Sequence, residues 1–139
     1  LLLDDGDRRL LSEFNLTASR FYILYYLGEE SGISSRRLAE LLICDKSNIT
    51  RLVRAMTAEG LVLKRPHERD GRKHRLFLTD EGLALRTAVL SKHTAYVHSR
   101  LDCCTPEEKD SLHAALGKLK QNLEAELEPG VADAQAAGD

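Results

Sequence analysis

The sequence predicts a mainly α-helical fold with one small β-hairpin, arranged as a winged helix-turn-helix plus a helical dimerisation region. Three observations lead to this fold class. Two short stretches of helical periodicity flank a three-residue turn, two alternating stretches flank a basic turn, and long helical stretches follow. With 139 residues, 42% of them apolar and 30% charged, the chain has the size of one ordinary domain and can bury a core.

The first segment, residues 1–16, is expected to form the end of a helix and to belong to the dimerisation region. Leu10 and Leu11 can face inward, although Gly6 interrupts the pattern. The chain does not begin with Met, so we expect it to lack part of its natural N-terminus. The three leading leucines are too short for a secretory signal, and no apolar run approaches the ~18 residues that span a bilayer, so no membrane segment is predicted.

The winged helix is predicted to cover residues 17–79. Thr17 is a favourable N-cap for its first helix. Three apolar residues then keep helical spacing: Phe21, Leu24 and Leu27. Gly28 and Gly32 are expected to end this helix.

A helix-turn-helix follows. Ser34 or Ser35 can cap its first helix, and "ICD" supplies the turn. Asp45 can cap the second helix, where a carboxylate also suits the helix dipole. The first helix is expected to bury Leu38, Leu41 and Leu42, and the second to bury a stripe made of Ile49, Leu52, Val53 and Met56.

The opposite side of the second helix carries hydroxyl, amide and cationic groups. Hydrogen-bonding groups surrounded by positive charge are what a helix in a DNA major groove needs, because bases and phosphates must both be contacted. The candidate DNA-binding residues of this helix are Lys46, Ser47, Asn48, Thr50, Arg51 and Arg54. The alternative is an ordinary helix with an exposed polar face.

The next segment favours a hairpin with a basic tip. "LVLKR" and "HRLFLT" alternate as strands do, and "HERDGRK" between them contains Asp70-Gly71, a strong turn dipeptide. A thin arginine-bearing hairpin can enter a minor groove. Arg72 is the expected inserting residue, and Asp70 can orient its guanidinium. Further candidate DNA contacts are Arg65, Arg69 and Lys73.

Residues 80–128 are predicted to form a C-terminal helical dimerisation region. Thr79 caps a helix that runs to about Leu101, and Thr105, Pro106 and Glu108 match a capping box for another helix. Its stripe of Leu112, Leu116, Leu119, Leu123 and Leu127 is more than a single chain of this length readily covers, so we expect a homodimer. Residues 129–139 are expected to be a disordered tail.

The charge is polarised, although the net charge of the whole chain is only −2. Residues 46–75 hold nine basic and three acidic residues, a net charge of +6. Residues 101–139 hold three basic and nine acidic residues, a net charge of −6. One part of the chain can therefore meet a polyanion that another part avoids.

The three cysteines, Cys44, Cys103 and Cys104, do not form a regular framework, which fits a reducing compartment. Cys103 and Cys104 could be a redox pair or two ordinary loop thiols. A metal- or thiol-dependent sensor or enzyme is the competing class, with ligands from the cysteines and from His67, His74, His93, His98 and His113. No metal spacing, catalytic triad or phosphate-binding glycine loop is present, so neither a cofactor nor an enzyme is predicted.

Several segments together resemble the MarR/SlyA group of bacterial winged-helix transcription regulators. They are "LTASRFYIL", "LAELL-ICDKSNITRLVRAMTAEGLVLKR", "RDGRKHRLFLTDEG" and "TPEEKDSL". The resemblance implies a cytoplasmic homodimer that binds double-stranded DNA. It also implies a repressor of palindromic operators that a small aromatic ligand or cysteine oxidation releases.

Carried over by position, the resemblance implies base reading by Ser47, Asn48, Thr50 and Arg51, and minor-groove insertion of Arg72 with support from Asp70. A ligand pocket could involve Tyr22, Tyr25 and Tyr26, although tyrosines at helical spacing are more often core or interface residues. The chain also departs from the family. Ile43 stands where glycine is frequent, the first helix is short, and the N-terminal sensing cysteine is missing, so Cys44 is expected to pack in the core. A winged helix used only for protein contacts is a third alternative.

Overall fold

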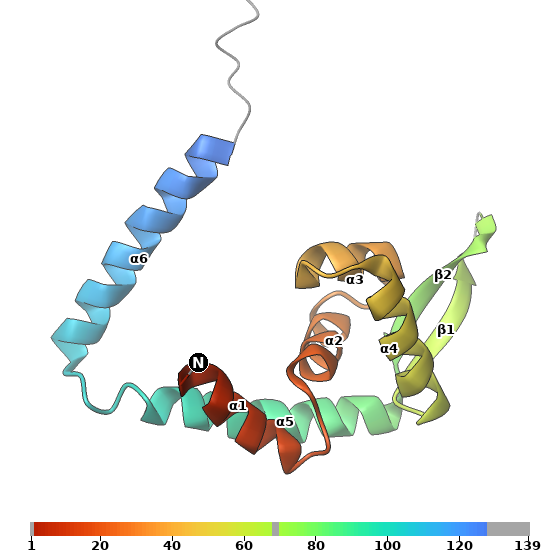
Figure 1. Cartoon of the computed structure of the whole chain (residues 1–139), viewed down its shortest axis with the longest axis horizontal. Coiled ribbons are helices and arrows are strands. Elements are labelled where there is room, and N and C mark those ends of the chain that lie inside the picture. The colour runs from red at the N-terminus through yellow and green to blue at the C-terminus, as the bar shows by residue number, and fades with distance from the viewer. Residues whose placement is uncertain (1, 68–69, 128–139) are drawn as a thin grey trace, which may run out of the picture. The chain divides into compact units, whose positions relative to one another are not determined.

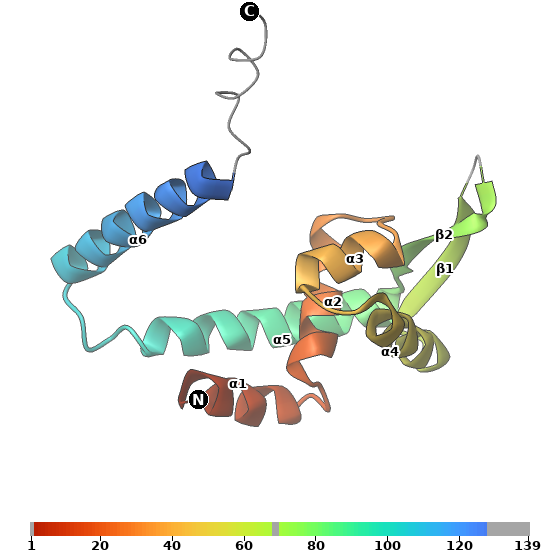
Figure 2. The same cartoon turned by 45° about the horizontal axis from the view of Figure 1, so that its top comes forward.

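The computed structural model describes residues 2–67 and 70–127. Contacts divide the chain into two compact units, Leu1–Tyr96 and Val97–Asp139, with the division inside one helix. The elements, shown in Figures 1 and 2, are α1 (Leu2–Ser12), α2 (Ala18–Glu29), α3 (Ser35–Leu42), α4 (Lys46–Ala58), β1 (Val62–His67), β2 (Asp70–Leu78), α5 (Asp80–Ser99) and α6 (Pro106–Leu127). The mainly helical fold with one hairpin is thus confirmed. The division by role at residues 16, 79 and 128 stays a prediction, because compactness does not report dimerisation.

The first unit holds every fully buried apolar side chain of the described residues. Leu10 and Leu11 of α1 are buried as expected, and α1 is one continuous helix that includes Gly6. Helix α1 lies along α5 (Figures 1 and 2), where Glu13 pairs with Lys92 and Asp7 lies 3.7 Å from His93. The shared core is built from α1, α2, α3, α4, both strands and Val89 of α5.

Helix α2 begins and packs as predicted, but its end differs. The Thr17 hydroxyl accepts a hydrogen bond from the Arg20 amide, and Phe21, Leu24 and Leu27 are buried. The helix continues through Gly28 to Glu29, so the prediction that Gly28 ends it is wrong. A Cβ at Gly28 would lie 2.0 Å from Arg86 Nε. Any larger residue at this position would displace the Arg86 side chain, which crosses the helix surface there.

Helices α3 and α4 form the predicted helix-turn-helix. Ser34 is the N-cap of α3, and its hydroxyl accepts from the Arg37 amide at 3.1 Å. Leu38 is fully buried, whereas Leu41 and Leu42 are half-buried and Ala39 lies deeper than either. Cys44 is half-buried against the core, as expected. Asp45 occupies the N-cap position of α4 without a side-chain capping bond.

The hairpin pairs antiparallel, but its turn lies elsewhere than predicted. The register runs regularly from Val62↔Leu78 to Pro66↔His74 and then jumps to His67↔Asp70. Asp70 and Gly71 therefore belong to β2 and do not form the turn. Residues 71–73 fall between two consecutive pairs, beside Pro66, whose nitrogen cannot donate to the ladder. An isolated bridge from Ile33 to Leu76 adds a third segment to the sheet, which the sequence did not predict.

The second unit contains α6, and the N-terminus of this helix is capped as predicted. The Thr105 amide donates to Glu108 Oε2 at 2.8 Å, and the Glu108 amide donates to the Thr105 hydroxyl at 3.3 Å. These two bonds are the capping box. Along α6, Leu112, Leu116, Leu119 and Leu123 are 47–55% exposed in the single chain.

Ile43, in the turn between α3 and α4, combines two unfavourable properties. Its backbone is left-handed, at φ 49° and ψ 47°, and its side chain is 94% exposed. A left-handed conformation costs an L-residue roughly 1–2 kcal/mol, and a β-branched residue adopts it rarely. The side chain gains no burial there to offset this cost.

We expect Ile43→Gly to raise the free energy of unfolding by about 0.5–1 kcal/mol, because relief of strain exceeds the added chain entropy of glycine. Urea unfolding measures the difference. Gly60→Ala is the matched control, since Gly60 has φ 75° and no atom within 4 Å of an added Cβ. It should lower stability by about 1 kcal/mol. A loss of stability in Ile43→Gly would show that the isoleucine is not strained.

Candidate nucleic-acid interface

Helix α4 has one buried and one exposed face. Ile49, Val53 and Met56 are fully buried, and Leu52 is half-buried against the core. A shallow depression on the other face is lined by Lys46, Ser47, Thr50, Arg51 and Arg54. The buried stripe fixes the rotation of the helix about its axis. The polar groups are therefore directed to solvent by the same packing that holds the helix.

The polar groups near the start of α4 are ordered by local hydrogen bonds. Arg51 Nη2 donates to Asn48 Oδ1 at 3.0 Å, which links two candidate base-reading side chains one turn apart. The Thr50 hydroxyl donates to the Lys46 carbonyl at 2.8 Å, which leaves its oxygen free to accept. The amide and the guanidinium together offer donors and acceptors of the kind that base edges require.

The cations of α4 differ from several of those on α2, α3 and α5. None of Lys46, Arg51 and Arg54 forms an ion pair with a described carboxylate. By contrast, Arg20 pairs with Glu59, Arg86 with Glu29, and Lys92 with Glu13. The positive charge of the α4 face is thus not neutralised by the neighbouring carboxylates.

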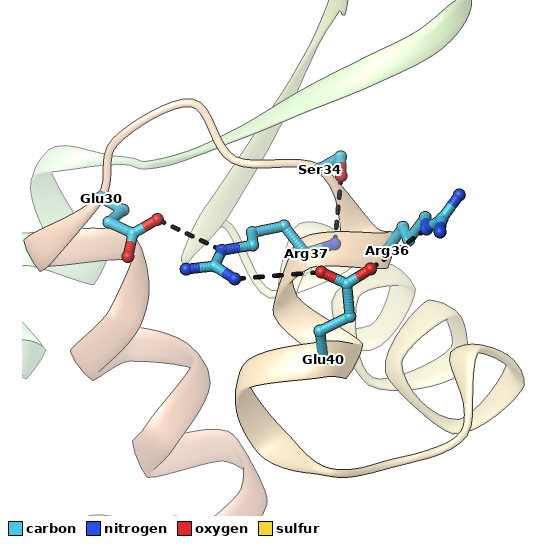
Figure 3. A network of polar contacts seen from close by, with 5 residues as sticks. All are labelled: Glu30, Ser34, Arg36, Arg37 and Glu40. Atoms are coloured by element: carbon cyan, nitrogen blue, oxygen red, sulfur yellow. Dashed lines mark hydrogen bonds and ion pairs between the residues drawn. The ribbon is translucent and has the colours of Figure 1, made fainter. Parts of the chain in front are cut away.

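Helix α3 shows the same contrast at close range. Figure 3 shows Arg37 between two carboxylates, with Nε 3.6 Å from Glu30 and Nη1 3.9 Å from Glu40. Arg36 donates from Nε to Glu40 at 3.1 Å. This network joins the end of α2 to the first turns of α3 and engages both arginines with acids. Exposed pairs of this kind add little stability, so their main effect is to neutralise the positive charge of the two arginines.

The hairpin lies beside α4 at the same end of the first unit (Figures 1 and 2). Arg65 on β1 is directly opposite Arg75 on β2, and its guanidinium carbon lies 5.0 Å from the centre of the Phe77 ring. Asp70, Arg72 and Lys73 belong to β2, and their side chains are outside the described structure. Arg69 lies outside the described residues altogether. The candidate wing residues therefore flank the jump in register.

One junction holds the end of α4, the hairpin and α5 together. The Thr79 hydroxyl donates to the Gly60 carbonyl at 2.5 Å and accepts from the Gly82 amide at 3.0 Å. The Thr79 amide donates to the Leu61 carbonyl at 3.2 Å. Gly82 lies so close to Leu61 that an added Cβ would be 2.1 Å from its carbonyl oxygen. The distance between recognition helix and wing is set at this junction.

Comparison with known proteins decides the family. The model of the MarR family matches residues 16–74. The HTH-type transcriptional regulator PecS of Dickeya dadantii (strain 3937) is 31% identical over 126 residues, which cover 88% of this chain and 76% of PecS. This chain belongs to the MarR family. It is a DNA-binding transcription regulator with a winged helix, and the resemblance read from its motifs is confirmed.

Solved structures share the fold of this MarR-family chain. Wild-type MarR from E. coli, in its apo form, has a TM-score of 0.78 at 24% identity, with coverage of 84% of this chain and 87% of MarR. The S. aureus MepR–DNA complex has a TM-score of 0.74 at 21% identity, with coverage of 86% and 88%. At these identities the likeness establishes the arrangement of the elements, not the role of any residue.

The three tyrosines of the MarR-family chain do not converge on one point. Tyr25 and Tyr26 meet edge to face with ring centres 5.3 Å apart, and Arg86 lies over Tyr25. Tyr22 is 42% exposed and contacts Phe21. A cavity of about 250 Å³ lies instead at the base of the wing, and its lining includes Leu27, Leu63, Arg65, Phe77 and Leu83. The sequence did not indicate it, because its walls come from separate elements.

The described residues hold neither a gathered set of metal ligands nor a helix that could cross a membrane. Within residues 2–67 and 70–127, no three histidine, cysteine or acidic side chains gather as metal ligands. His93, one of the candidate ligands, stacks on Phe21 with ring centres 4.8 Å apart. No described helix is both long enough and apolar enough to cross a bilayer.

Proposed function

We propose that the chain is a homodimeric, sequence-specific repressor that binds a two-fold-symmetric operator in double-stranded DNA through α4 and the wing, and that a small aromatic ligand releases it. The observation that carries this proposal is the contrast between the unneutralised cations of α4 and the paired cations around it. Phosphates supply the missing counter-charge, and the ordered amide and hydroxyl groups read bases.

Recognition is assigned to the first turns of α4. Ser47, Asn48, Thr50 and Arg51 present donors and acceptors toward the major groove, and Lys46 and Arg54 contact phosphates at its edges. The bond from Arg51 to Asn48 limits the side-chain freedom that would otherwise be lost on binding. Pre-ordering of this kind favours affinity and selects one orientation of the guanidinium.

The wing supplies a second contact. Arg65 lies opposite Arg75 on the two strands with its guanidinium over Phe77, and it is assigned to a phosphate contact. Arg72, supported by Asp70, is assigned to the minor groove, with Arg69 and Lys73 at the flanking phosphates. This assignment follows the family resemblance of the Asp-x-Arg motif.

Dimerisation is assigned to the terminal helices, above all to α6. Four leucines at spacings of four, three and four are about half exposed there, which leaves a continuous apolar stripe on the single chain. A second copy covers such a stripe and places two recognition helices on successive major grooves. Repression then results because the bound dimer excludes the transcription machinery from the same DNA.

The ligand site is assigned to the cavity at the wing base. Its walls combine apolar side chains with Arg65 and Asp80, which suits a small aromatic molecule that carries polar groups. The cavity touches both strands and the start of α5, so an occupant could change the position of the wing. The alternative site near Tyr22, Tyr25 and Tyr26 has less support, because the tyrosines pack on each other, on Phe21 and under Arg86.

The proposal excludes catalysis and places the protein in the cytoplasm, where bacterial DNA lies. A metal-dependent sensor or enzyme, one part of the competing class, would need a set of metal ligands, and the described residues hold no group of three. Bound sequences selected from a random DNA pool supply the operator for all tests below. A winged helix that serves only protein contacts would select no sequence.

Arg51→Ala should weaken operator binding by about 1–3 kcal/mol and relax selectivity at one base pair, because a base-edge contact is lost. Arg36→Ala is the matched control, since Arg36 is exposed on the adjacent helix but paired with Glu40. It should change affinity by less than about 0.5 kcal/mol. Equal losses in the two variants would refute a specific role for the α4 face. Fluorescence anisotropy at fixed salt measures both.

Operator binding should depend steeply on salt. If each subunit neutralises about four phosphates, the dimer neutralises about eight, and log K should fall against log[salt] with a slope near −7. Arg54→Ala should make the slope shallower by about 2, one contact for each subunit. Lys118→Ala removes an equal charge from α6 and should leave the slope unchanged. A slope shallower than about −2 in the unaltered protein would show that the basic face does not meet phosphate.

The double variant Leu119→Glu/Leu123→Glu should be monomeric and should lose operator affinity at least about tenfold, because buried charge opposes association. Ala114→Glu/Gln121→Glu adds the same charge on the opposite side of α6 and should remain dimeric. Sedimentation velocity and anisotropy give the two readouts. A stable monomer that binds the operator with unaltered affinity would contradict this assignment.

A further inference from the structure

Two adjacent cysteines between α5 and α6 form a thiol pair that DNA binding does not use. Cys103 is exposed, Cys104 is half-buried, and their sulfur atoms are 3.7 Å apart. The backbone around them is held on both sides. The Cys104 amide donates to the Leu101 carbonyl at 3.0 Å, and the capping box of Thr105 follows immediately. The two thiols are thus presented together on an ordered turn.

The spacing of the pair suits a chelate better than a disulfide. Adjacent Cα atoms lie about 3.8 Å apart, below the roughly 4.4–6.8 Å that disulfides usually span, so oxidation requires the backbone to move. Two sulfurs bound to one atom at about 2.3 Å lie roughly 3.3–3.8 Å apart, for bond angles from about 90° to tetrahedral. The observed separation of 3.7 Å falls within this range, and a small rotation of either side chain reaches its lower end.

The bridging atom must accept only two protein ligands. Zinc takes four in structural sites, and the described residues offer no group of three potential ligands. A soft, thiol-seeking atom that brings its own third substituent has no such need. Trivalent arsenic in an organic arsenical is of this kind. We propose that Cys103 and Cys104 form a chelating dithiol site for monosubstituted trivalent arsenicals.

The reaction balances without an oxidant. Each thiol gives up its proton, two sulfur–arsenic bonds form, and the arsenic–oxygen bond of the arsenoxide breaks as its oxygen leaves with the two protons as water. Arsenic stays trivalent, and the sulfurs are not oxidised. The site is independent of the function proposed above, because it involves no residue of the DNA-binding face.

The surroundings of Cys104 make its thiol a poor sensor of peroxide. The hydrogen bond with Cys103 raises the pKa of the Cys104 thiol above its ordinary value, and partial burial and the Glu108 carboxylate raise it further. The raised pKa keeps Cys104 mainly in its thiol form at neutral pH, and a thiol attacks peroxide more slowly than a thiolate does. The arsenical reaction is also slowed, but the chelated product with both sulfurs bound to arsenic is the same whichever form reacts.

The test uses the reduced full-length chain and phenylarsine oxide as the probe. Intact-mass spectrometry should show one phenylarsenic group on each chain, bound with loss of water. The adduct should survive millimolar glutathione and be removed by 2,3-dimercaptopropanol, because the second thiol acts at a high effective concentration. Cys103→Ser and Cys104→Ser should each retain the group at least about 100-fold less well in glutathione. Cys44→Ser is the matched control and should retain it like the unaltered protein.

Two further measurements keep the result decisive. Circular dichroism reports whether the serine variants are folded, and Cys103→Ala and Cys104→Ala replace any that are not. Retention should not depend on protein concentration, because both sulfurs belong to one chain. Loss of the group to glutathione as fast as from Cys103→Ser would overturn the proposal. So would retention that rises with protein concentration, or retention that depends on Cys44.

Discussion

The DNA-binding half of this molecule depends on the junction at Thr79. One hydroxyl there contacts Gly60, which follows the C-cap of α4, and the first turn of α5, while the adjacent amide contacts Leu61 just before the wing. Gly82 permits this by allowing α5 to approach the Leu61 backbone without a side chain between them. Three hydrogen bonds thus join the end of α4, the start of the wing and α5 at this point.

The positive surface of α4 depends on which basic side chains form ion pairs, more than on the overall composition of the chain. Arginines that hold α2, α3 and α5 in place each have a carboxylate partner, so they contribute to assembly without adding to the positive field. The α4 cations have none among the described carboxylates, and they lie on the face opposite the buried stripe. A chain with a slightly negative total charge can in this way present a strongly positive surface.

Features decided within one turn of chain could be predicted from the sequence. The caps at Thr17 and Thr105 and the stripe of α4 depend on neighbours a few residues away, and all are present. The role of Gly28 could not be predicted, because it depends on Arg86, far along the chain. The hairpin turn was misplaced for a related reason. Asp70-Gly71 has turn chemistry, but the pairing of the whole ladder decides which residues turn.

Part of the arrangement of the candidate site could also be predicted from the sequence. The sequence placed the polar candidates of α4 on the exposed face correctly, since helical periodicity assigns each residue to a face, and their roles in DNA binding stay a prediction. The neutralisation of Arg36 and Arg37 and the cavity at the wing base required knowledge of which elements meet. The sequence therefore indicated candidate polar residues on α4. It did not indicate the ion pairs and the cavity that surround them, because these depend on contacts between distant elements.

The jump in register beside Pro66 has an evolutionary consequence. The pairs from Val62↔Leu78 to Pro66↔His74 follow one regular register. Residues 71–73 lie outside this regular part of the ladder. Insertions or deletions in that outer part change the length of the wing and leave the inner ladder, Thr79 and the recognition helix in place. Descendants of this protein can thus vary the outer part of the hairpin by altering a few codons, with little risk to folding.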